Sequence, residues 1–512
     1  MSGLGVRSDA VKALASSLNG VENIQESLDI IISALKEKIE RRELTSSMIG
    51  RDAVAAVVAD LSKEDEEART EAVQYLGAFE TPRLTYDPTR RSLTLITGEP
   101  MDLFADAEWK PKMFRERYWL ARQRLARHAL FAEGGGRAAG AGAGDHCQLT
   151  YVDSLLGSEG VRWLCGLLVQ VEEGRYYLED AAARVPLDLS EAGYTTGLYT
   201  ENCFVIVEGE MVNNVFKVKM MGMPPAEARG DALRAIAGGP HVDLFGKGGA
   251  GGQDQLARLE AEAQGQMVAI LADVHLDLPE VLEKLKVLFA GFASCEPLPV
   301  FVLMGNFSSK SASMGVEGIE DMIESFTALS DLLASFPALC AEGRFVFVPG
   351  PGDPGHGNVL PRMPLPRPLR QALGRRLPHA VFATNPCRLR VYTQELVLFR
   401  EDLLRKMQRH ALVQQDKEAP DSDATETLVA TLLAQGHLCP LPLPARPIHW
   451  KADPALQLYP LPHAVVLADQ TDQYKWTYED CHAFNPGSFP TDFSFIVYTP
   501  ATQDVEFSKI DD

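Results

Sequence analysis

Two apolar runs, separated by an amphipathic stretch, dominate the second half of the chain. Residues 267–271 and 300–304 are apolar throughout, and each run is short enough to be a buried strand. Between them, a proline opens a stretch whose apolar residues recur at helical spacing. This order predicts a βαβ unit, whose ligand sites lie beyond the carboxyl ends of its strands. Asp273 and His275 follow the first run, and Asn306 follows the second.

Similar apolar runs recur to the end of the chain, with helical patterns between them. We interpret 263–512 as an α/β domain built on a mixed sheet, with its last strands antiparallel. The further predicted strands are 344–348, 380–383, 395–399, 464–468 and 493–498, and the predicted helices are 316–336 and 425–435.

Short strand candidates separated by turn signals precede this domain. Five of them within about seventy residues predict an OB-type barrel in 146–262. Acidic residues such as Glu172, Glu179 and Glu208 stand at the strand ends. An OB domain that grips single strands needs basic residues interleaved with exposed aromatics, so protein contact is favoured over DNA binding. The candidates are 166–171, 175–179, 185–189, 203–209 and 215–220.

The N-terminal segment 1–76 is predicted to be a helical domain, because its apolar residues recur every three or four positions. Residues 77–145 form a connecting region that ends in a glycine-rich linker. Within it, 110–128 is basic and aromatic. This segment is either a phosphate-binding face or, as we favour, a solvated or interface helix. The glycine-rich stretch 246–252 lacks the spacing of a phosphate loop and is predicted to be a second linker.

The charge and the cysteine pattern of the chain disfavour several classes of protein. The formal net charge of −21 disfavours a nonspecific duplex-DNA binder, because such binding relies on Lys and Arg neutralising phosphates. The eight cysteines are scattered without a CxxC pair, so neither a zinc ribbon nor a redox dithiol is indicated. No signal peptide or membrane-spanning run is seen. We expect a soluble intracellular protein without membrane contact.

The polar residues after the strands resemble the metal-binding motifs of calcineurin-like metallophosphoesterases. Those enzymes hold two cations with converging carboxylates and imidazoles. The first motif, D-x-H, is kept as Asp273 and His275. Asn306 stands where the resemblance implies a bridging carboxylate, and Asp353 follows Pro and Gly in place of the expected Asn and His. His437 is the candidate lone histidine, and both imidazoles of the last motif are replaced in 487–490.

A neutral amide cannot offset two divalent cations as a shared carboxylate does. We therefore expect the fold to be kept and the catalysis to be lost. The vestigial site would comprise Asp273, His275, Asn306, Asp353 and His437, with no catalytic residue, no bound metal and no cofactor.

Many stretches in the same order resemble the B-subunits of replicative DNA polymerases, in particular those of polymerase epsilon. The resemblance implies a multidomain α+β fold: an N-terminal helical bundle like the C-terminal domain of AAA+ proteins, an OB-type barrel, and a calcineurin-like phosphoesterase α/β sandwich. The stretches are MFRERY (113–118), GLYTENCFV (197–205), LADV-x-LD (271–277), VLEKL (281–285), GNFSS (305–309), RFVFVPGP-x-DPG (344–355), TNPCR (384–388), FREDL (399–403), QGHL-x-PLPL (435–443) and NPGSFP (485–490).

The same resemblance implies a nuclear, non-catalytic scaffold. Its OB and phosphoesterase-like domains would hold the zinc-binding C-terminal domain of the polymerase catalytic subunit. Its N-terminal domain would dock on GINS in the CMG helicase, and the small histone-fold subunits would associate indirectly. DNA contact would be weak or indirect.

Two other hypotheses stay open on the sequence. One is a divergent metal-dependent phosphodiesterase that uses Asp273, His275, Asn306 and His437. The other is an OB-fold single-strand DNA-binding protein that uses the basic segment 110–128.

Overall fold

The apolar runs of the C-terminal half form central strands of facing sheets in the computed structural model of the chain. The structure describes residues 72–99, 102–131, 147–155, 157–236, 243–246, 250–310, 316–355, 358–413 and 423–511, and before residue 72 only 5–6, 31, 48–49, 51, 54 and 57.

The chain divides into two units, Met1–Val73 and Gln74–Asp512. In the first unit, β1 (Gly5–Val6) pairs in parallel with β2 (Met48–Ile49). The helical domain predicted for 1–76 falls almost entirely outside the described residues.

The first sheet of the second unit contains the predicted βαβ unit. Its strand order is β16-β15-β14-β13-β22-β23. β13 to β16 are parallel, whereas β22 and β23 run antiparallel, as predicted for the last strands. The strands are β13 (Val268–Leu271), β14 (Val300–Met304), β15 (Arg344–Val348), β16 (Ala380–Phe382), β22 (Ser494–Thr499) and β23 (Asp504–Lys509).

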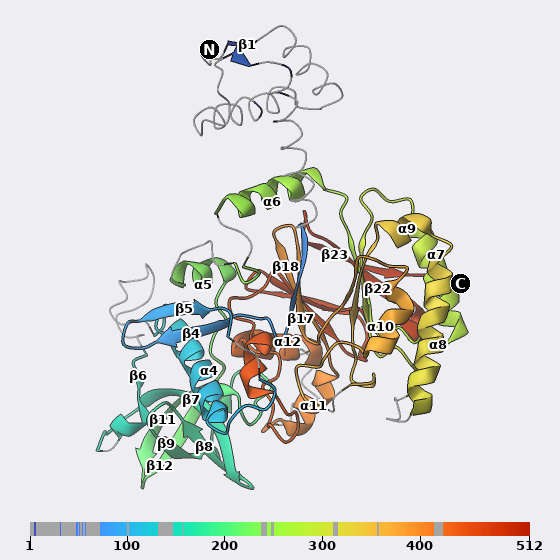
Figure 1. The fold of residues 1–512 in the computed structure, drawn as a ribbon. Coiled ribbons are helices and arrows are strands. Elements are labelled where there is room, and N and C mark those ends of the chain that lie inside the picture. The colour runs from blue at the N-terminus through green and yellow to red at the C-terminus, as the bar shows by residue number, and fades with distance from the viewer. Residues whose placement is uncertain are drawn as a thin grey trace. The chain divides into compact units, whose positions relative to one another are not determined.

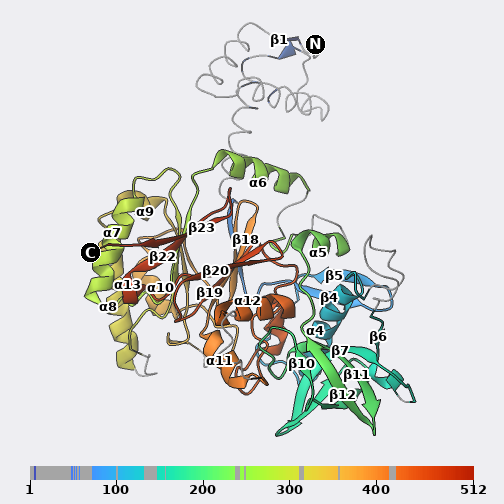
Figure 2. The same cartoon turned by 180° about the vertical axis from the view of Figure 1, so that it is seen from behind.

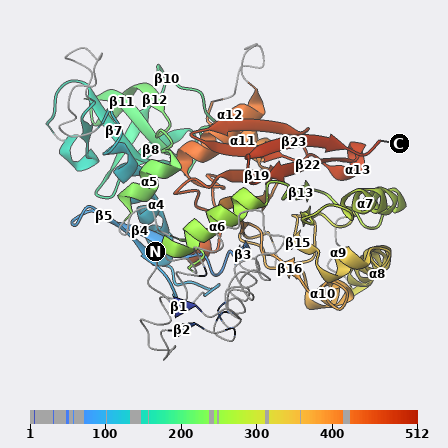
Figure 3. The same cartoon turned by 90° about the horizontal axis from the view of Figure 1, so that it is seen from above.

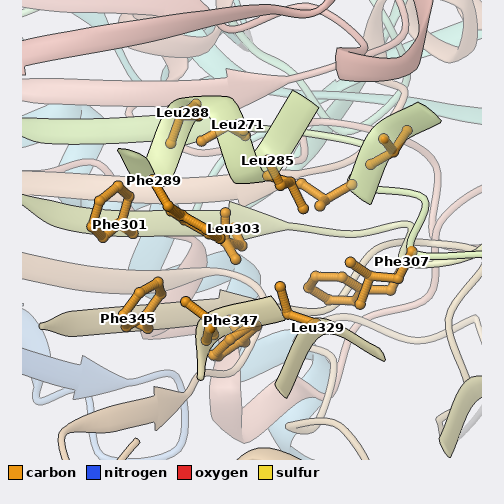
Figure 4. Packing of buried hydrophobic residues seen from close by; sticks show 14 of the residues in the cluster. Leu271, Leu285, Leu288, Phe289, Phe301, Leu303, Phe307, Leu329, Phe345 and Phe347 are labelled. Atoms are coloured by element: carbon orange, nitrogen blue, oxygen red, sulfur yellow. The ribbon is translucent and has the colours of Figure 1, made fainter. Parts of the chain in front are cut away.

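Helices cover the outer face of this sheet and bury its aromatic strand residues (Figure 1). Phe289 of the first helix meets the Phe301 ring edge-on, with ring centroids 5.3 Å apart, and Phe301 stacks on Phe345 at 4.9 Å. Figure 4 shows this core between the strands and the helix side chains. The helices are α7 (Pro279–Phe292), α8 (Val316–Leu333), α9 (Pro337–Ala341) and α10 (Arg367–Gly374), and a short α13 (Phe489–Asp492) precedes β22.

The second sheet faces the first, so the body has four layers: helices, sheet, sheet, helices (Figure 2). Phe484 and Tyr498 stack between the sheets, with centroids 6.2 Å apart. Its order is β20-β21-β19-β18-β17-β3. The elements are β3 (Val73–Gly77), β17 (Cys387–Val391), β18 (Gln394–Arg400), β19 (Ala464–Ala468), β20 (Tyr474–Tyr478), β21 (Cys481–Asn485), α11 (Leu403–His410), α12 (Ala424–Gln435) and η3 (Trp450–Leu456).

The single mixed sheet expected from the runs is therefore wrong in one respect, because the strands divide between two sheets. Strands such as β17 and β20 carry no continuous apolar run. In β17, Arg388 and Arg390 are buried because they pair with Glu395 and Asp243. A buried strand whose charges are neutralised by tertiary pairing lacks an apolar run, so its sequence resembles that of a surface segment.

The predicted barrel is present in 147–222 (Figure 3). All five candidate strands form, and pairing of β12 with β9 closes the sheet. Phe216 lies in the barrel core. The elements are β6 (Leu149–Thr150), η1 (Val152–Leu155), β7 (Arg162–Glu172), β8 (Arg175–Glu179), β9 (Arg184–Asp188), β10 (Gly193–Tyr194), β11 (Phe204–Val212) and β12 (Val215–Gly222).

A long helix, α4 (Trp109–Leu125), packs between the barrel and the hairpin of β4 (Arg83–Asp87) and β5 (Ser92–Ile96). After the barrel come α5 (Arg229–Ala235) and α6 (Ala250–Glu262). Residues 250–252 of the expected second linker are thus the first turn of α6, and Glu260 in that helix accepts hydrogen bonds from Thr393. None of the helices in the described ranges combines the length and hydropathy that a bilayer crossing requires.

Candidate functional site

Asp273 is the centre of a buried polar network at the carboxyl end of β13. Its side chain is only 2 % exposed, and its backbone has a φ of 52°. The Asn306 backbone N–H donates to Asp273 Oδ1 at 3.0 Å, and the Ser488 hydroxyl donates to Oδ2 at 3.0 Å. The turns that follow β13, β14 and β21 therefore converge on one carboxylate.

The network contains a cation that the metal-binding motifs do not include. Arg400, the last residue of β18, is fully buried. Its Nη2 and Nε donate to Asp273 Oδ1 at 2.7 and 3.2 Å. Nε also donates to the Gly305 carbonyl at 2.9 Å, and Nη1 donates to Asp402 at 2.8 Å. The signal in the sequence was an arginine ending an apolar run, inside the FREDL stretch at 399–403.

Arg400 keeps its charge in this setting. Burial works against a charged guanidinium, but Asp273 and Asp402 raise the pKa of Arg400 above its usual range. Asp273 Oδ1 is thus already bonded to a fixed positive charge.

Asn306 and Asp353 bind each other's loops instead of facing a shared ion. Asn306 Oδ1 accepts from the Gly352 N–H at 2.6 Å. Asp353 accepts from the backbone N–H groups of Phe307 at 2.8 Å and Gly350 at 2.7 Å. Burial raises the pKa of Asp353 to about 6, against the lowering effect of these two hydrogen bonds.

A glycine is required where these loops meet. A Cβ on Gly305 would lie 1.9 Å from Asp353 Oδ2 and 2.5 Å from the Gly350 nitrogen. The close approach of the backbone to the Asp353 carboxylate therefore excludes any side chain at position 305.

The two histidines predicted for the site, His275 and His437, differ in how close they lie to this network. His275 is half-buried beside it, and burial lowers its pKa. His437 lies after α12, where its Nδ1 accepts from the Cys439 N–H at 2.9 Å and its Nε2 is 3.2 Å from Asp453. The structure thus brings Asp273, Asn306 and Asp353 together and places the contacts of His437 elsewhere.

These residues do not fit a two-metal centre. Such a centre needs a shared carboxylate and several imidazoles, whereas here an amide and a guanidinium take those places. Within the described ranges, no cluster of three or more His, Cys, Asp or Glu side chains is arranged to hold a metal ion. The arrangement can fix three strand ends rigidly, and that is its evident physical effect.

His437 belongs to a second buried network, which joins α4 to the sandwich. Arg117 of α4 forms a bidentate ion pair with Asp453 of η3. Burial works to raise the pKa of Asp453, but Arg117 and His437 hold it well below its usual range. Burial, together with Arg117, lowers the pKa of His437 to about 4. Because Nδ1 accepts a hydrogen bond, neutral His437 carries its proton on Nε2 and donates to Asp453.

The barrel is tied to the sandwich through the segment 197–205. The Gln435 side chain accepts from the Phe204 N–H at 2.7 Å and donates to the Phe204 carbonyl at 2.8 Å. Asn202 donates to the Leu441 carbonyl at 3.1 Å, and the Leu412 N–H donates to the Tyr199 carbonyl at 2.7 Å. These bonds are buried and paired, so barrel and sandwich form a continuous interface.

The basic segment 110–128 is an interface helix rather than a phosphate-binding face over most of its length. Arg117 and Arg124 are buried, and Arg124 donates to the Ala434 carbonyl at 2.8 Å. Phe204 of β11 packs against Tyr118 of α4 rather than into the barrel core. A single-strand DNA binder could therefore not use Arg117 and Arg124, whereas Lys110 and Arg115 are exposed on this helix.

Comparison with known proteins assigns both domains. Residues 268–475 match the family of the DNA polymerase alpha/epsilon B-subunit. Residues 107–225 match the family described as DNA polymerase epsilon subunit 2-like, OB-fold domain.

Full-length relatives agree with this match. DNA polymerase epsilon subunit 2 of Homo sapiens is 39% identical over 522 residues, covering 99% of this chain and 96% of that protein. The DNA polymerase epsilon B-subunit of Arabidopsis thaliana is 36% identical, covering 95% and 92%. The Drosophila melanogaster subunit 2 is 33% identical, covering 100% and 96%.

Among solved structures, an archaeal phosphodiesterase aligns with 48% of this chain and 99% of its own, at 10% identity and a TM-score of 0.26. That likeness is too low to support an argument, whereas the sequence relatives cover nearly the whole chain at 33–39% identity. The chain belongs to the DNA polymerase epsilon subunit 2 family.

Proposed function

We propose that this protein is the non-catalytic accessory subunit of a DNA polymerase epsilon holoenzyme and acts in nuclear DNA replication. The observation that carries the proposal is Arg400 bonded to Asp273 in a chain that is related to these subunits along nearly its full length. A guanidinium at the strand ends stabilises the sandwich but cannot activate a water as a metal does. In this proposal the sandwich is a calcineurin-like phosphoesterase fold that has lost its catalysis.

The barrel and sandwich would together hold the zinc-binding C-terminal domain of the catalytic subunit. Their shared interface, through α4 and 197–205, supports this assignment because it supplies one rigid surface. The N-terminal segment 1–76 would dock on GINS in the CMG helicase. The small histone-fold subunits would associate indirectly, and direct contact with DNA would be weak.

Co-expression with the polymerase catalytic subunit tests the proposal. We expect the two chains to co-purify at equal stoichiometry through size exclusion at moderate salt. Truncation of the catalytic subunit's C-terminal zinc-binding domain should abolish the complex, because that domain is the assigned contact. A complex that survives this truncation unchanged, or the failure of the full-length chains to associate, would contradict the assignment.

Hydrolysis of a generic phosphodiester is the test of the vestigial site. With added Mn²⁺, the purified protein should release no more product than the His275→Ala variant. The reason is that the Asp273 carboxylate is bonded to Arg400 and that an amide, Asn306, stands where the metal centre would need a carboxylate. Metal-dependent turnover that the substitution removes would mean that the pocket binds metal after all, and would restore the phosphodiesterase hypothesis.

A further inference from the structure

The tripeptide Asp-Leu-Phe occurs twice in this chain, at 102–104 and 243–245. Both copies adopt the same turn. The Phe104 N–H donates to Asp102 Oδ1 at 3.0 Å, and the Phe245 N–H donates to Asp243 Oδ1 at 2.8 Å. Each turn therefore fixes the aspartate carboxylate against the backbone N–H of the phenylalanine two residues later.

The second copy binds an arginine within the chain. Arg390 of β17 donates through Nη1 to Asp243 Oδ1 at 2.8 Å, and its guanidinium carbon lies 4.7 Å from the centre of the Phe245 ring. Both charged side chains are buried in this contact. The turn thus recognises a guanidinium with a carboxylate and an aromatic face at once.

The first copy has the same groups and no such partner in the described residues. Phe104 is 90 % exposed, the highest value among large apolar side chains in the described part of the chain. Asp102 is half exposed and forms an ion pair with Lys451, whose Nζ lies 3.6 Å from Oδ2. The backbone is nevertheless held in place, because His449 Nδ1 donates to the Leu103 carbonyl at 3.2 Å.

We propose that the turn 102–104 is a docking element for a protein partner that presents an arginine, and that this partner is the polymerase catalytic subunit. The partner's identity rests on the proposed function; its chemistry rests on the contact between Arg390 and the second copy. A phenylalanine that is 90 % exposed on an anchored turn can fill an apolar pocket of a partner. The neighbouring Asp106 and Glu108 are exposed acids that complement a cation and repel nucleic-acid phosphates. A second copy of this chain is not the partner through Arg390, since that arginine is already engaged.

Affinity for the full-length catalytic subunit is the first test. Phe104→Ser should weaken binding about tenfold or more, as expected for loss of an interface anchor. Asp102→Asn should weaken it in the same direction. Phe507→Ser removes another exposed phenylalanine, 50 % exposed on β23, and should bind like the wild type. Phe104→Ser should leave Tm unchanged, whereas Phe245→Ser should lower it.

Site-specific crosslinking is the second test. A photoreactive benzoylphenylalanine at position 104 should crosslink the catalytic subunit near an arginine, and replacing that arginine by methionine should weaken binding as much as Phe104→Ser does. Equal affinity of Phe104→Ser and wild type would overturn the inference. So would crosslinks to DNA, to a second copy of this chain, or to a site without arginine. If the wild-type chains do not associate, the proposed function itself is contradicted. If they associate and Phe104→Ser binds as tightly, only the role of the turn 102–104 is contradicted.

Discussion

Arg400→Ala is expected to lower the free energy of unfolding by about 3–5 kcal/mol, the usual cost of leaving one partner of a buried ion pair unpaired. The substitution removes the bonds to Asp273, Asp402 and the Gly305 carbonyl together. Asp273, which is 2 % exposed, would then carry an uncompensated charge or take up a proton. Denaturant unfolding of the full chain measures the loss.

Arg405→Ala is the matched control, because Arg405 is exposed on the neighbouring helix α11 and should change stability little. The double variant Arg400→Met with Asp273→Asn removes both charges and should recover much of the loss. If Arg400→Ala and Arg405→Ala unfold at the same denaturant concentration, Arg400 does not stabilise the strand ends as described.

Arg117→Met should destabilise the contact between α4 and the sandwich by a similar amount, about 3–5 kcal/mol. Methionine keeps much of the side-chain volume but removes the guanidinium, so the buried Asp453 carboxylate keeps only the hydrogen bonds from neutral His437 and Gln457. Arg115→Met is the control, since Arg115 is exposed on the same helix. Thermal and denaturant unfolding of both variants would be compared, and equal stabilities would rule out the ion pair as a significant contribution.

The same variant should change the pH dependence of stability. The pKa of folded His437 is about 4, below the ordinary value of about 6.5, so the unfolded chain takes up the proton first. This contribution to stability is complete above pH 6.5 and is lost as the pH falls towards 4. Between pH 7 and pH 5 the loss amounts to about 2 kcal/mol.

In Arg117→Met, the guanidinium that lowers the pKa of His437 is gone, and Asp453 remains to raise it. The pKa of His437 should rise, and the loss of stability between pH 7 and pH 5 should become smaller. An unchanged or steeper dependence relative to wild type would show that His437 does not titrate in this network.

The hydrophobic pattern was sufficient to predict much of the fold. The runs that became β13, β14, β15 and β19 match their predicted bounds to within a residue, because a strand buried on both faces must be apolar throughout. All five predicted barrel strands form, but β7 begins four residues earlier and β11 ends three residues later than predicted. β17 was missed because its arginines are neutralised by acids that are distant in the sequence.

The candidate site was predictable only in part. Asp273 and Asn306 follow apolar runs directly, so strand-end topology alone brings them together. His437 was placed with them by motif order, but its contacts are with Asp453 and Cys439. A lone histidine has no local pattern that reports its distant neighbours.

Residue type and local periodicity were enough to predict most strands of the two facing sheets and the polar residues that follow them. The buried partner of Asp273 could not be predicted in this way. Arg400 is 127 positions from Asp273, and nothing local to either residue predicts their bond. Packing of the two sheets brings the strand ends together, and burial of the carboxylate then requires a cation, which this chain supplies from its own β18.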